Sequence, residues 1–434
     1  MDTQPATRAA TTATFEYRTA NRTRGTRFAA TIILCVLAVV YIRANVVNVL
    51  NTWSRPNDFD VYYRAAKDIA TGVSPYENPA YFYPPAVAFL VTPIAWMGYQ
   101  TARWTWFALS QGMLLAAAWL TWRASGRCLL GLGCVAWVWA MGGASVETLR
   151  IGQLSPVLLV AIAAAYDGRV WVQDTGVSAA FALKYFPGIL AVALWLQRGW
   201  RGILKLAGIA FLSVSVPWLV LAGFFTGPKF ALKAHYWLGT PAMFNWSLPS
   251  LVLRILMPIH RGRQIPFLWE HGNVAATLHL APSLQILSVA VALATLAGGL
   301  LALTAGCRGK LNAEQVPLAM AALVSLALVV APVSWTHYQV LQYPGAALLL
   351  HRAVAWRRWA AAAGVVLSFA LCYQLPELVL IHYHDIHSGW TAYSPLTLYA
   401  ATSISPLAAL GLFGLALIML RRESRCQAPT AQAK

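Results

Sequence analysis

Residues 28–50 read FAATIILCVLAVVYIRANVVNVL, and the acidic stretch Asn57-Asp58-Phe59-Asp60-Val61-Tyr62 follows soon after them. The apolar run has the roughly 20 residues that a helix needs to cross about 30 Å of hydrocarbon. Carboxylates are costly at a membrane boundary and are not needed to hold apolar helices together. The stretch 57–62 is therefore the first place to look for chemistry.

The whole chain has the composition of a membrane protein. Its 434 residues are 59% hydrophobic and 11% charged, whereas a soluble domain carries roughly 25% charged residues. Several further apolar runs are long enough to cross a bilayer. The sequence predicts an all-α, polytopic protein of the cell membrane, of the bacterial inner or plasma membrane type.

The net charge of +18 suggests a nucleic-acid-binding protein until the charges are placed. Lys and Arg fall in short clusters between apolar runs, the pattern that fixes the orientation of membrane helices. We therefore expect no nucleic-acid partner. Residues 1–27 carry five Arg and no apolar periodicity, which predicts a disordered cytoplasmic tail. No cleavage site follows the first apolar run, so we interpret that run as a retained anchor.

Keeping the basic clusters in the cytoplasm predicts twelve spans with both ends of the chain inside. Run 84–98 is short and contains three Pro, so it is expected to lie on the outer surface. Residues 175–197 are expected to form a hairpin of two short helices. The other spans are 28–50, 103–122, 128–145, 156–167, 204–224, 284–305, 316–331, 338–352, 359–381 and 397–420.

The distribution of the basic residues favours this arrangement of spans. The cytoplasmic segments hold 20 of the 32 Lys and Arg, the longer outer segments hold 11, and Arg43 lies within a span. The alternative, in which 84–98 crosses the membrane, places Arg123 and Arg127 outside. We therefore predict one membrane domain at 28–420, with outer loops 51–102 (the candidate catalytic loop) and 225–283, and a second cytoplasmic tail at 421–434.

Most of the unusual polar residues fall in the predicted outer loops. An enzyme acting on lipid-linked substrates would gather such groups at one surface. A transporter or flippase for a lipid-linked sugar, the main alternative, would distribute them along a path through the midplane. A polysaccharide polymerase or ligase is a further alternative, because loop 225–283 is long enough to hold its catalytic groups.

After the first span, apolar residues recur at helical spacing from Phe59 to Ile69, and Gly72 provides a natural stop. This predicts an amphipathic helix in the interface plane. Asp58 would then lie at its N-cap, and Asp60 in the first turn would pair with Arg64. A catalytic or metal-binding role for the two carboxylates stays open beside these structural ones.

Four more side chains have a functional and a structural interpretation. Gln153 either hydrogen-bonds a sugar hydroxyl or caps a helix. Lys184, in an apolar hairpin, either holds a phosphate or extends toward the interface. Arg43 has the same two alternatives. His337 either contacts a phosphate or a sugar, or is structural.

The remaining motifs are weaker. Asn245-Trp246-Ser247 and Ser334-Trp335-Thr336-His337-Tyr338 place aromatic residues beside hydrogen-bonding groups, but interfacial Trp and Tyr are common. The segment 382–387 contains three His without the spacing of zinc sites. The six Cys show neither metal spacing nor a convincing pairing, so no disulfide framework is expected.

Taken in order, these motifs resemble those of a known family. The pattern covers about residues 55–340 and is similar to glycosyltransferase family 87, of the GT-C superfold, which includes mycobacterial polyprenyl-phosphomannose-dependent mannosyltransferases and a related arabinofuranosyltransferase. The residues that carry the resemblance are Asp58–Tyr62, Gly72–Tyr76, Tyr83–Pro85, Gly152–Gln153, Lys184–Pro187, Asn245–Ser247 and Ser334–His337. One departure is Ser155, where relatives usually have Asn.

The resemblance implies a GT-C fold, a donor that is a monosaccharide on polyprenyl phosphate, and Asp58 as catalytic base. The acceptor would be a glycolipid or a glycan on the extracytoplasmic side. A single base without a separate nucleophile predicts inversion at the anomeric carbon. We expect no cofactor, with a divalent metal at Asp58 and Asp60 as the alternative. The candidate substrate-binding residues are Asp60, Arg43, Tyr62, Tyr83, Gln153, Lys184, Asn245, Ser247 and His337.

Overall fold

The computed structural model describes residues 27–52, 58–222 except 79 and 82, 245–256, 282–373 except 308, 332 and 333, and 395–426. The segment 382–387 and most of loop 225–283 lie outside this part, as do most of the two tails. The described residues are mainly helical, as predicted, and they include one isolated β-bridge, between Asn245 and Trp335.

The first helix runs over Arg27–Asn51 and includes a π-helical turn, η1. The labelled elements, of which η1 and α2 belong to the end of this first helix, begin and end at these residues: η1 Arg43–Val47, α2 Asn48–Thr52, α3 Asp58–Ala70, η2 Pro75–Glu77, α4 Pro85–Ala95, α5 Tyr99–Ala124, α6 Leu129–Met141, α7 Gly143–Arg150, α8 Ser155–Ala165, α9 Val170–Leu183, η3 Phe186–Leu190, α10 Ala191–Ala222, α12 Leu248–Leu256, α13 Pro282–Gly306, α14 Gln315–Val330, η5 Thr336–Gln342, α15 Tyr343–Ala355, α16 Trp359–Cys372 and α18 Pro395–Cys426.

Within the described ranges, four helices are long and apolar enough to cross a membrane, or five if the bent pair α6 and α7 forms one span. Four shorter apolar helices accompany them: α4, α8, α14 and α16. The polytopic α-helical class is therefore confirmed, whereas the count of twelve spans is not. The predicted span 128–145 is in fact two helices that meet at an angle of 53°.

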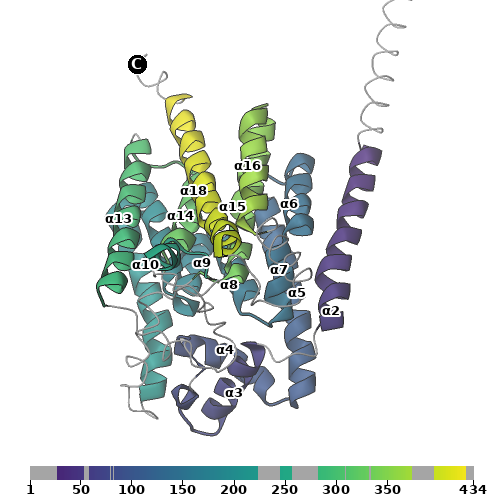
Figure 1. Cartoon of the computed structure of the whole chain (residues 1–434), viewed down its shortest axis with the longest axis vertical. Helices are drawn as coiled ribbons and strands as arrows, with labels where there is room; N and C mark the ends of the chain where they lie inside the picture. The colour runs from purple at the N-terminus through teal and green to yellow at the C-terminus, as the bar shows by residue number, and fades with distance from the viewer. Residues whose placement is uncertain are drawn as a thin grey trace, which may run out of the picture.

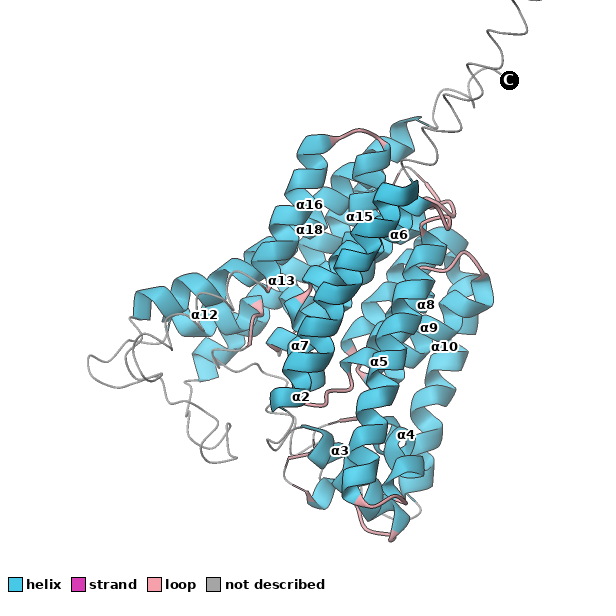
Figure 2. Ribbon diagram, turned by 90° about the vertical axis from the view of Figure 1, so that its right-hand side faces the viewer, coloured by secondary structure: helices cyan, strands magenta, loops and turns pink. Residues whose placement is uncertain are grey.

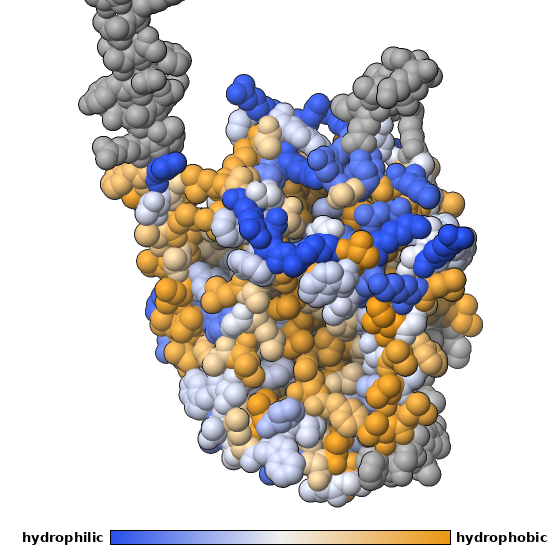
Figure 3. Space-filling model, turned by 180° about the vertical axis from the view of Figure 1, so that it is seen from behind, coloured by the Kyte–Doolittle hydropathy of each residue, from blue (hydrophilic) through white to orange (hydrophobic). Residues whose placement is uncertain are grey.

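The molecule has two different ends. The first helix begins, and α18 finishes, at one end of the bundle, and α3 and α4 lie at the other (Figure 1). Hydrophilic side chains gather at the end where α18 finishes, above a belt of hydrophobic ones (Figure 3). The short helix α4 packs beside α3 instead of standing among the long helices, as expected for run 84–98 (Figures 1 and 2).

The predicted hairpin is present. The helix α9 ends at Leu183, and the chain turns back through Lys184 and η3 into α10. Arg198 closes the hairpin with a 2.5 Å ion pair to Asp174. A positive φ of 69° at Gly199 then lets α10 change direction.

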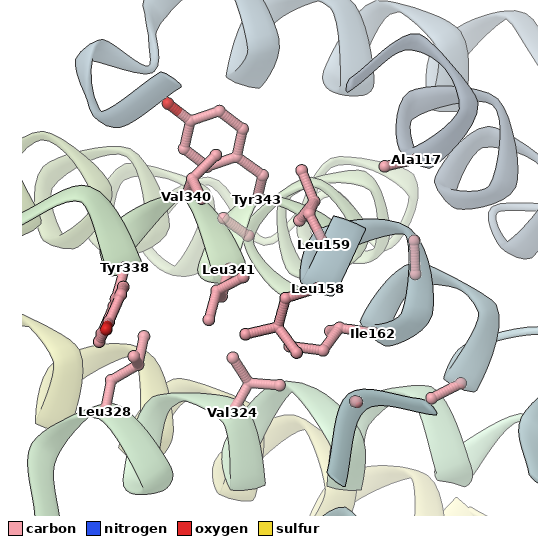
Figure 4. Close-up of a cluster of buried hydrophobic side chains, with 14 of the residues drawn as sticks. Ala117, Leu158, Leu159, Ile162, Val324, Leu328, Tyr338, Val340, Leu341 and Tyr343 are labelled. Carbon is pink, nitrogen blue, oxygen red and sulfur yellow. The ribbon is translucent and has the colours of Figure 1, made fainter. Parts of the chain in front are cut away.

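The core is centred on α14, in which every residue from Gln315 to Val329 is buried. A helix that is apolar all round belongs inside a bundle. Its Val324 and Leu328 face Leu158 of α8 and Leu341 of η5 (Figure 4). A smaller aromatic cluster, built on Tyr76 and Tyr81, joins α3 to α4. The site described next lies where these two clusters meet.

Candidate active site

Five short segments that are far apart in the sequence converge at the α3 end of the bundle. They are the first turn of α3, the residue Tyr83 before α4, the turn between α7 and α8, the tip of the α9 hairpin, and η5. They contribute Asp58, Tyr83, Gln153, Lys184 and His337 respectively. The sequence motifs at these positions therefore belong to one site.

Asp58 is fixed through both its backbone and its side chain. Its amide nitrogen donates a 2.6 Å hydrogen bond to the carbonyl oxygen of Ile151. Its Oδ2 accepts a hydrogen bond from Nε2 of Gln153. The carboxylate therefore bonds a side chain from the turn between α7 and α8, which is not the N-cap arrangement considered from the sequence.

The surroundings of Asp58 make it a stronger base than an exposed aspartate. Burial raises the pKa of Asp58 to about 6, although the hydrogen bond from Gln153 and the charge of Lys184 act in the opposite direction. Glu147 raises the pKa further by charge repulsion. A carboxylate with a pKa near the working pH is suited to accept a proton.

Gln153 is the centre of the hydrogen-bond network. Its Oε1 accepts from the hydroxyl of Tyr62 at 2.8 Å, and its Nε2 also donates to the hydroxyl of Tyr83 at 3.4 Å. The turn that carries it is held by Gly152, with a φ of 70°, and by the indole of Trp106, which donates to the Gly152 carbonyl at 2.9 Å.

Lys184 brings a cation to the same site. Its Nζ donates a hydrogen bond to the hydroxyl of Tyr338, and it lies 3.6 Å from the ring centroid of Tyr338 and 5.1 Å from that of Tyr83. Burial lowers the pKa of Lys184 to about 7, and the charge of Asp58 opposes this shift. A buried ammonium that forms no salt bridge with a carboxylate in the described part of the chain is ready to bind an anion.

His337 lies beside this cation. The imidazole is 5% exposed and makes an edge-to-face contact with Tyr338, with ring centroids 4.5 Å apart. Burial, together with the charge of Lys184, lowers the pKa of His337 well below its usual value, so the ring is neutral. Its Nε2 has no hydrogen-bond partner within the described part of the chain.

Asn245 and Ser247 support this region. Oδ1 of Asn245 accepts a 2.7 Å hydrogen bond from the amide of Ser334, and the amide of Trp246 donates to the Ser334 carbonyl at 2.7 Å. Oγ of Ser247 accepts a 3.3 Å bond from the amide of Ser250 at the start of α12. These bonds link the segment 245–247 to the one that leads into His337.

Two predicted residues lie apart from this network. Asp60 accepts a hydrogen bond from the hydroxyl of Tyr99 in α5, and no ion pair joins it to Arg64 in the described structure. Arg43 is exposed on η1, and no hydrogen bond or ion pair joins it to Asp58 or Lys184 within the described residues. No group of three or more His, Cys, Asp or Glu among the described residues is arranged to hold a metal ion.

The structure adds residues that the sequence did not single out. Tyr338 contacts both Lys184 and His337, but at the sequence level it looked like an ordinary interfacial aromatic residue. Glu147 forms a bidentate ion pair with Arg150, at 2.8 and 2.7 Å, and acts electrostatically on Asp58. The spacing of Glu147 and Arg150 on one helix face was the available signal for this pair.

Comparisons with known proteins agree with the motif pattern. A family model described as Glycosyltransferase family 87 matches residues 81–332, which include Gln153 and Lys184 but not Asp58 or His337. The chain is also similar to a polyprenol-phosphate-mannose-dependent alpha-(1-2)-phosphatidylinositol pentamannoside mannosyltransferase of Mycolicibacterium smegmatis. The two are 28% identical over 282 residues, which are 62% of this chain and 60% of the relative. The chain thus spans about three fifths of the length of this relative.

Proposed function

Because the chain belongs to glycosyltransferase family 87 and is a membrane glycosyltransferase, we propose that it transfers a monosaccharide from polyprenyl phosphate to a hydroxyl group of a glycolipid or glycan. The sugar is of the mannose or arabinofuranose type. The reaction takes place on the extracytoplasmic side of the membrane, and the donor is confined to the bilayer by its prenyl chain.

Asp58 is the general base of the proposed reaction. Its carboxylate takes the proton of the acceptor hydroxyl as the acceptor oxygen forms a bond to the anomeric carbon of the donor sugar. The bond between that carbon and the phosphate oxygen breaks, and its electron pair stays on the phosphate. Direct displacement by one nucleophile inverts the configuration of the anomeric carbon.

Lys184 stabilises the leaving group. Negative charge develops on the polyprenyl phosphate as the bond breaks, and a preorganised cation in a site shielded from water stabilises it strongly. His337, neutral and with a free Nε2 in the described structure, provides one more polar contact for the phosphate or the sugar. We expect this set of residues to perform the transfer without a cofactor.

The observation that supports this proposal most is the presence of Asp58 and Lys184 in one site. A carboxylate and an ammonium are brought together at one end of an apolar bundle, where each influences the pKa of the other. Tyr83 links them, because it contacts Lys184 and also Gln153, which bonds Asp58. The carboxylate is suited to take the proton of the acceptor, and the ammonium is suited to bind the phosphate of the lipid carrier.

The mannosyl donor and the phosphatidylinositol mannoside acceptor in the name of the relative are the first substrates to test. Purified protein is incubated with a panel of polyprenyl-phosphate sugars and acceptors, and release of polyprenyl phosphate is followed. Asp58→Asn is expected to abolish release, whereas Asp68→Asn, on the same helix but outside the network, keeps it. Substantial activity of Asp58→Asn would move the role of base to Asp60 or away from α3.

A further inference from the structure

The side-chain amide of Gln153 has every hydrogen-bonding position occupied. Its oxygen accepts from the hydroxyl of Tyr62 at 2.8 Å and from the amide of Leu154 at 3.3 Å. Its nitrogen donates to Oδ2 of Asp58 and to the hydroxyl of Tyr83 at 3.4 Å. A primary amide offers two donors and two lone pairs, so no position is left for a further partner.

The orientation of this amide is determined by two of its partners. The backbone N–H of Leu154 can only donate, so the amide oxygen must face it. An ionised Asp58 can only accept, so the amide nitrogen must face Oδ2. Rotating the amide by 180° would break both bonds. The hydroxyls of Tyr62 and Tyr83 adapt to either arrangement.

A sugar hydroxyl would have to displace one of these partners. Gln153 is 1% exposed, and a buried polar group that loses its partner is destabilised. Tyr62 and Asp58 lie four residues apart on one face of α3, so Gln153 holds that face at two points. Its arrangement therefore suits holding α3 better than binding a ligand.

The network also distinguishes the two oxygens of Asp58. Gln153 occupies Oδ2, whereas Oδ1 has no hydrogen-bond partner among the residues that the structure describes. A general base needs one free lone pair directed at the proton it accepts. Oδ1 is the atom that meets this requirement.

We infer that Gln153 is a positioning residue for the base, which holds Oδ2 of Asp58 and leaves Oδ1 to take the acceptor proton. This role replaces the sugar contact considered from the sequence, and it rests on the proposed function of Asp58. The hydrogen bond that Gln153 donates also keeps the pKa of Asp58 lower than burial alone would set it.

The first test is the pH dependence of kcat, measured at saturating donor and acceptor, for Gln153→Met. Loss of the donated hydrogen bond raises the pKa of Asp58, so the acidic limb of the profile moves to higher pH, by about one unit. At pH 6.5 this shift lowers the ionised fraction of Asp58 about threefold, and the lost orientation of the carboxylate lowers kcat by up to about a hundredfold more. Only the first of these two effects recovers at pH 8. The matched control is Gln111→Met in α5, whose side chain bonds Tyr41 and Asn45 away from the site and which keeps the profile of the unmodified protein.

The second test separates positioning from sugar binding. The affinities of Gln153→Met for polyprenyl phosphate and for polyprenyl-phosphate mannose are measured without acceptor. A positioning residue leaves the ratio of the two dissociation constants within about twofold of its normal value. If Gln153 binds the sugar instead, the two dissociation constants of the variant converge, because the contribution of the sugar to donor binding is lost.

Either an unchanged pH profile or converging affinities would overturn the inference. If Gln153→Met does not fold, Tyr62→Phe removes one bond that holds the amide and leaves the bond to Asp58. It is then expected to shift the same limb upward by a smaller amount, and an unshifted limb would equally overturn the inference. Full activity of Asp58→Asn would instead refute the proposed role of Asp58 as the base.

Discussion

The amide nitrogen of Asp58 lies 2.6 Å from the carbonyl oxygen of Ile151, so the proposed base is held by the same turn that carries Gln153. This turn continues through Gly152, whose φ of 70° is readily adopted only by glycine. The position of Asp58 in the site therefore depends on the backbone of residues 151–153 as well as on side chains.

Gly152→Ala is expected to lower kcat far more than stability. An alanine at this φ costs about 1 kcal/mol, but a shift of about 1 Å at a catalytic group costs up to a hundredfold in rate. Gly126→Ala is the matched control, because Gly126 has a φ of 83° in the loop after α5, away from the site. Both variants should unfold at similarly reduced temperatures, and only Gly152→Ala should lose activity. Equal activities would show that the turn does not position the base.

The pH dependence of kcat/KM should be bell-shaped. The base must be ionised, so activity falls as the pH drops through about 6, the pKa of Asp58. The phosphate-binding lysine must be charged, so activity also falls as the pH rises through about 7, the pKa of Lys184 in the free enzyme. Initial rates at low donor concentration from pH 4.5 to 9 measure both limbs, and a flat profile between pH 5 and 8 would contradict these assignments.

Lys184→Met should weaken binding of the donor more than binding of the acceptor. A charged hydrogen bond to a phosphate contributes about 1.5–3 kcal/mol, which corresponds to roughly a 10- to 100-fold loss of affinity for polyprenyl phosphate. The pH profile of this variant should also lose its alkaline limb. Its acidic limb should move to higher pH, because Lys184 lowers the pKa of Asp58.

The control for this lysine is Lys67→Met. Lys67 is exposed on α3 and lies 5.7 Å from the ring centroid of Tyr63, so it makes a similar cation–π contact outside the network. Its loss should change neither affinity nor the pH profile. Equal losses of donor and acceptor affinity in Lys184→Met would argue against a phosphate contact.

The helix α3 shows how much of the site could be predicted from the sequence. The periodicity from Phe59 to Ile69 predicted its buried face: Phe59, Tyr62, Tyr63 and Ala66 are buried, whereas Ile69 is half-buried. The turn at Lys184 was predicted from the charge of Arg198. A single crossing by residues 175–197 would place Arg198 on the outer side, whereas a turn keeps it on the same side as the other basic clusters. Periodicity and charge bias act locally along the chain, so they can be read without knowing the packing.

The partners across the site could not be predicted in this way. Tyr99 bonds Asp60 from 39 residues away, where helical spacing favoured Arg64. Tyr338 reaches Lys184 over a separation of 154 residues. Such pairs depend on how α5, α9 and η5 pack, and in a membrane protein an aromatic residue in a functional site has the same local signature as one in the interface.

Asp58→Asn should be inactive and yet more stable than the unmodified protein at neutral pH. Burial raises the pKa of Asp58 from 3.8 to about 6, so the folded state binds the proton more tightly than the unfolded state. The ionised carboxylate therefore destabilises the fold above pH 6, and this cost disappears as the pH falls toward 4. Melting temperatures in detergent at pH 7.5 and 4.5 should show a stabilising effect of Asn that shrinks at the lower pH. A stabilisation that grows on acidification would mean that the carboxylate is not buried in the fold.

The two ends of the bundle should face opposite sides of the membrane, with the site outside. Lys67 is exposed on α3, and Lys310 is exposed in the turn before α14, at the end where α18 finishes. In a background without native cysteines, Lys67→Cys should react with a membrane-impermeant maleimide in intact cells, and Lys310→Cys only after lysis. This follows because the basic clusters gather at the α18 end and such clusters stay in the cytoplasm. The reverse labelling pattern would place Asp58 in the cytoplasm, and the transfer would then have to occur on that side of the membrane.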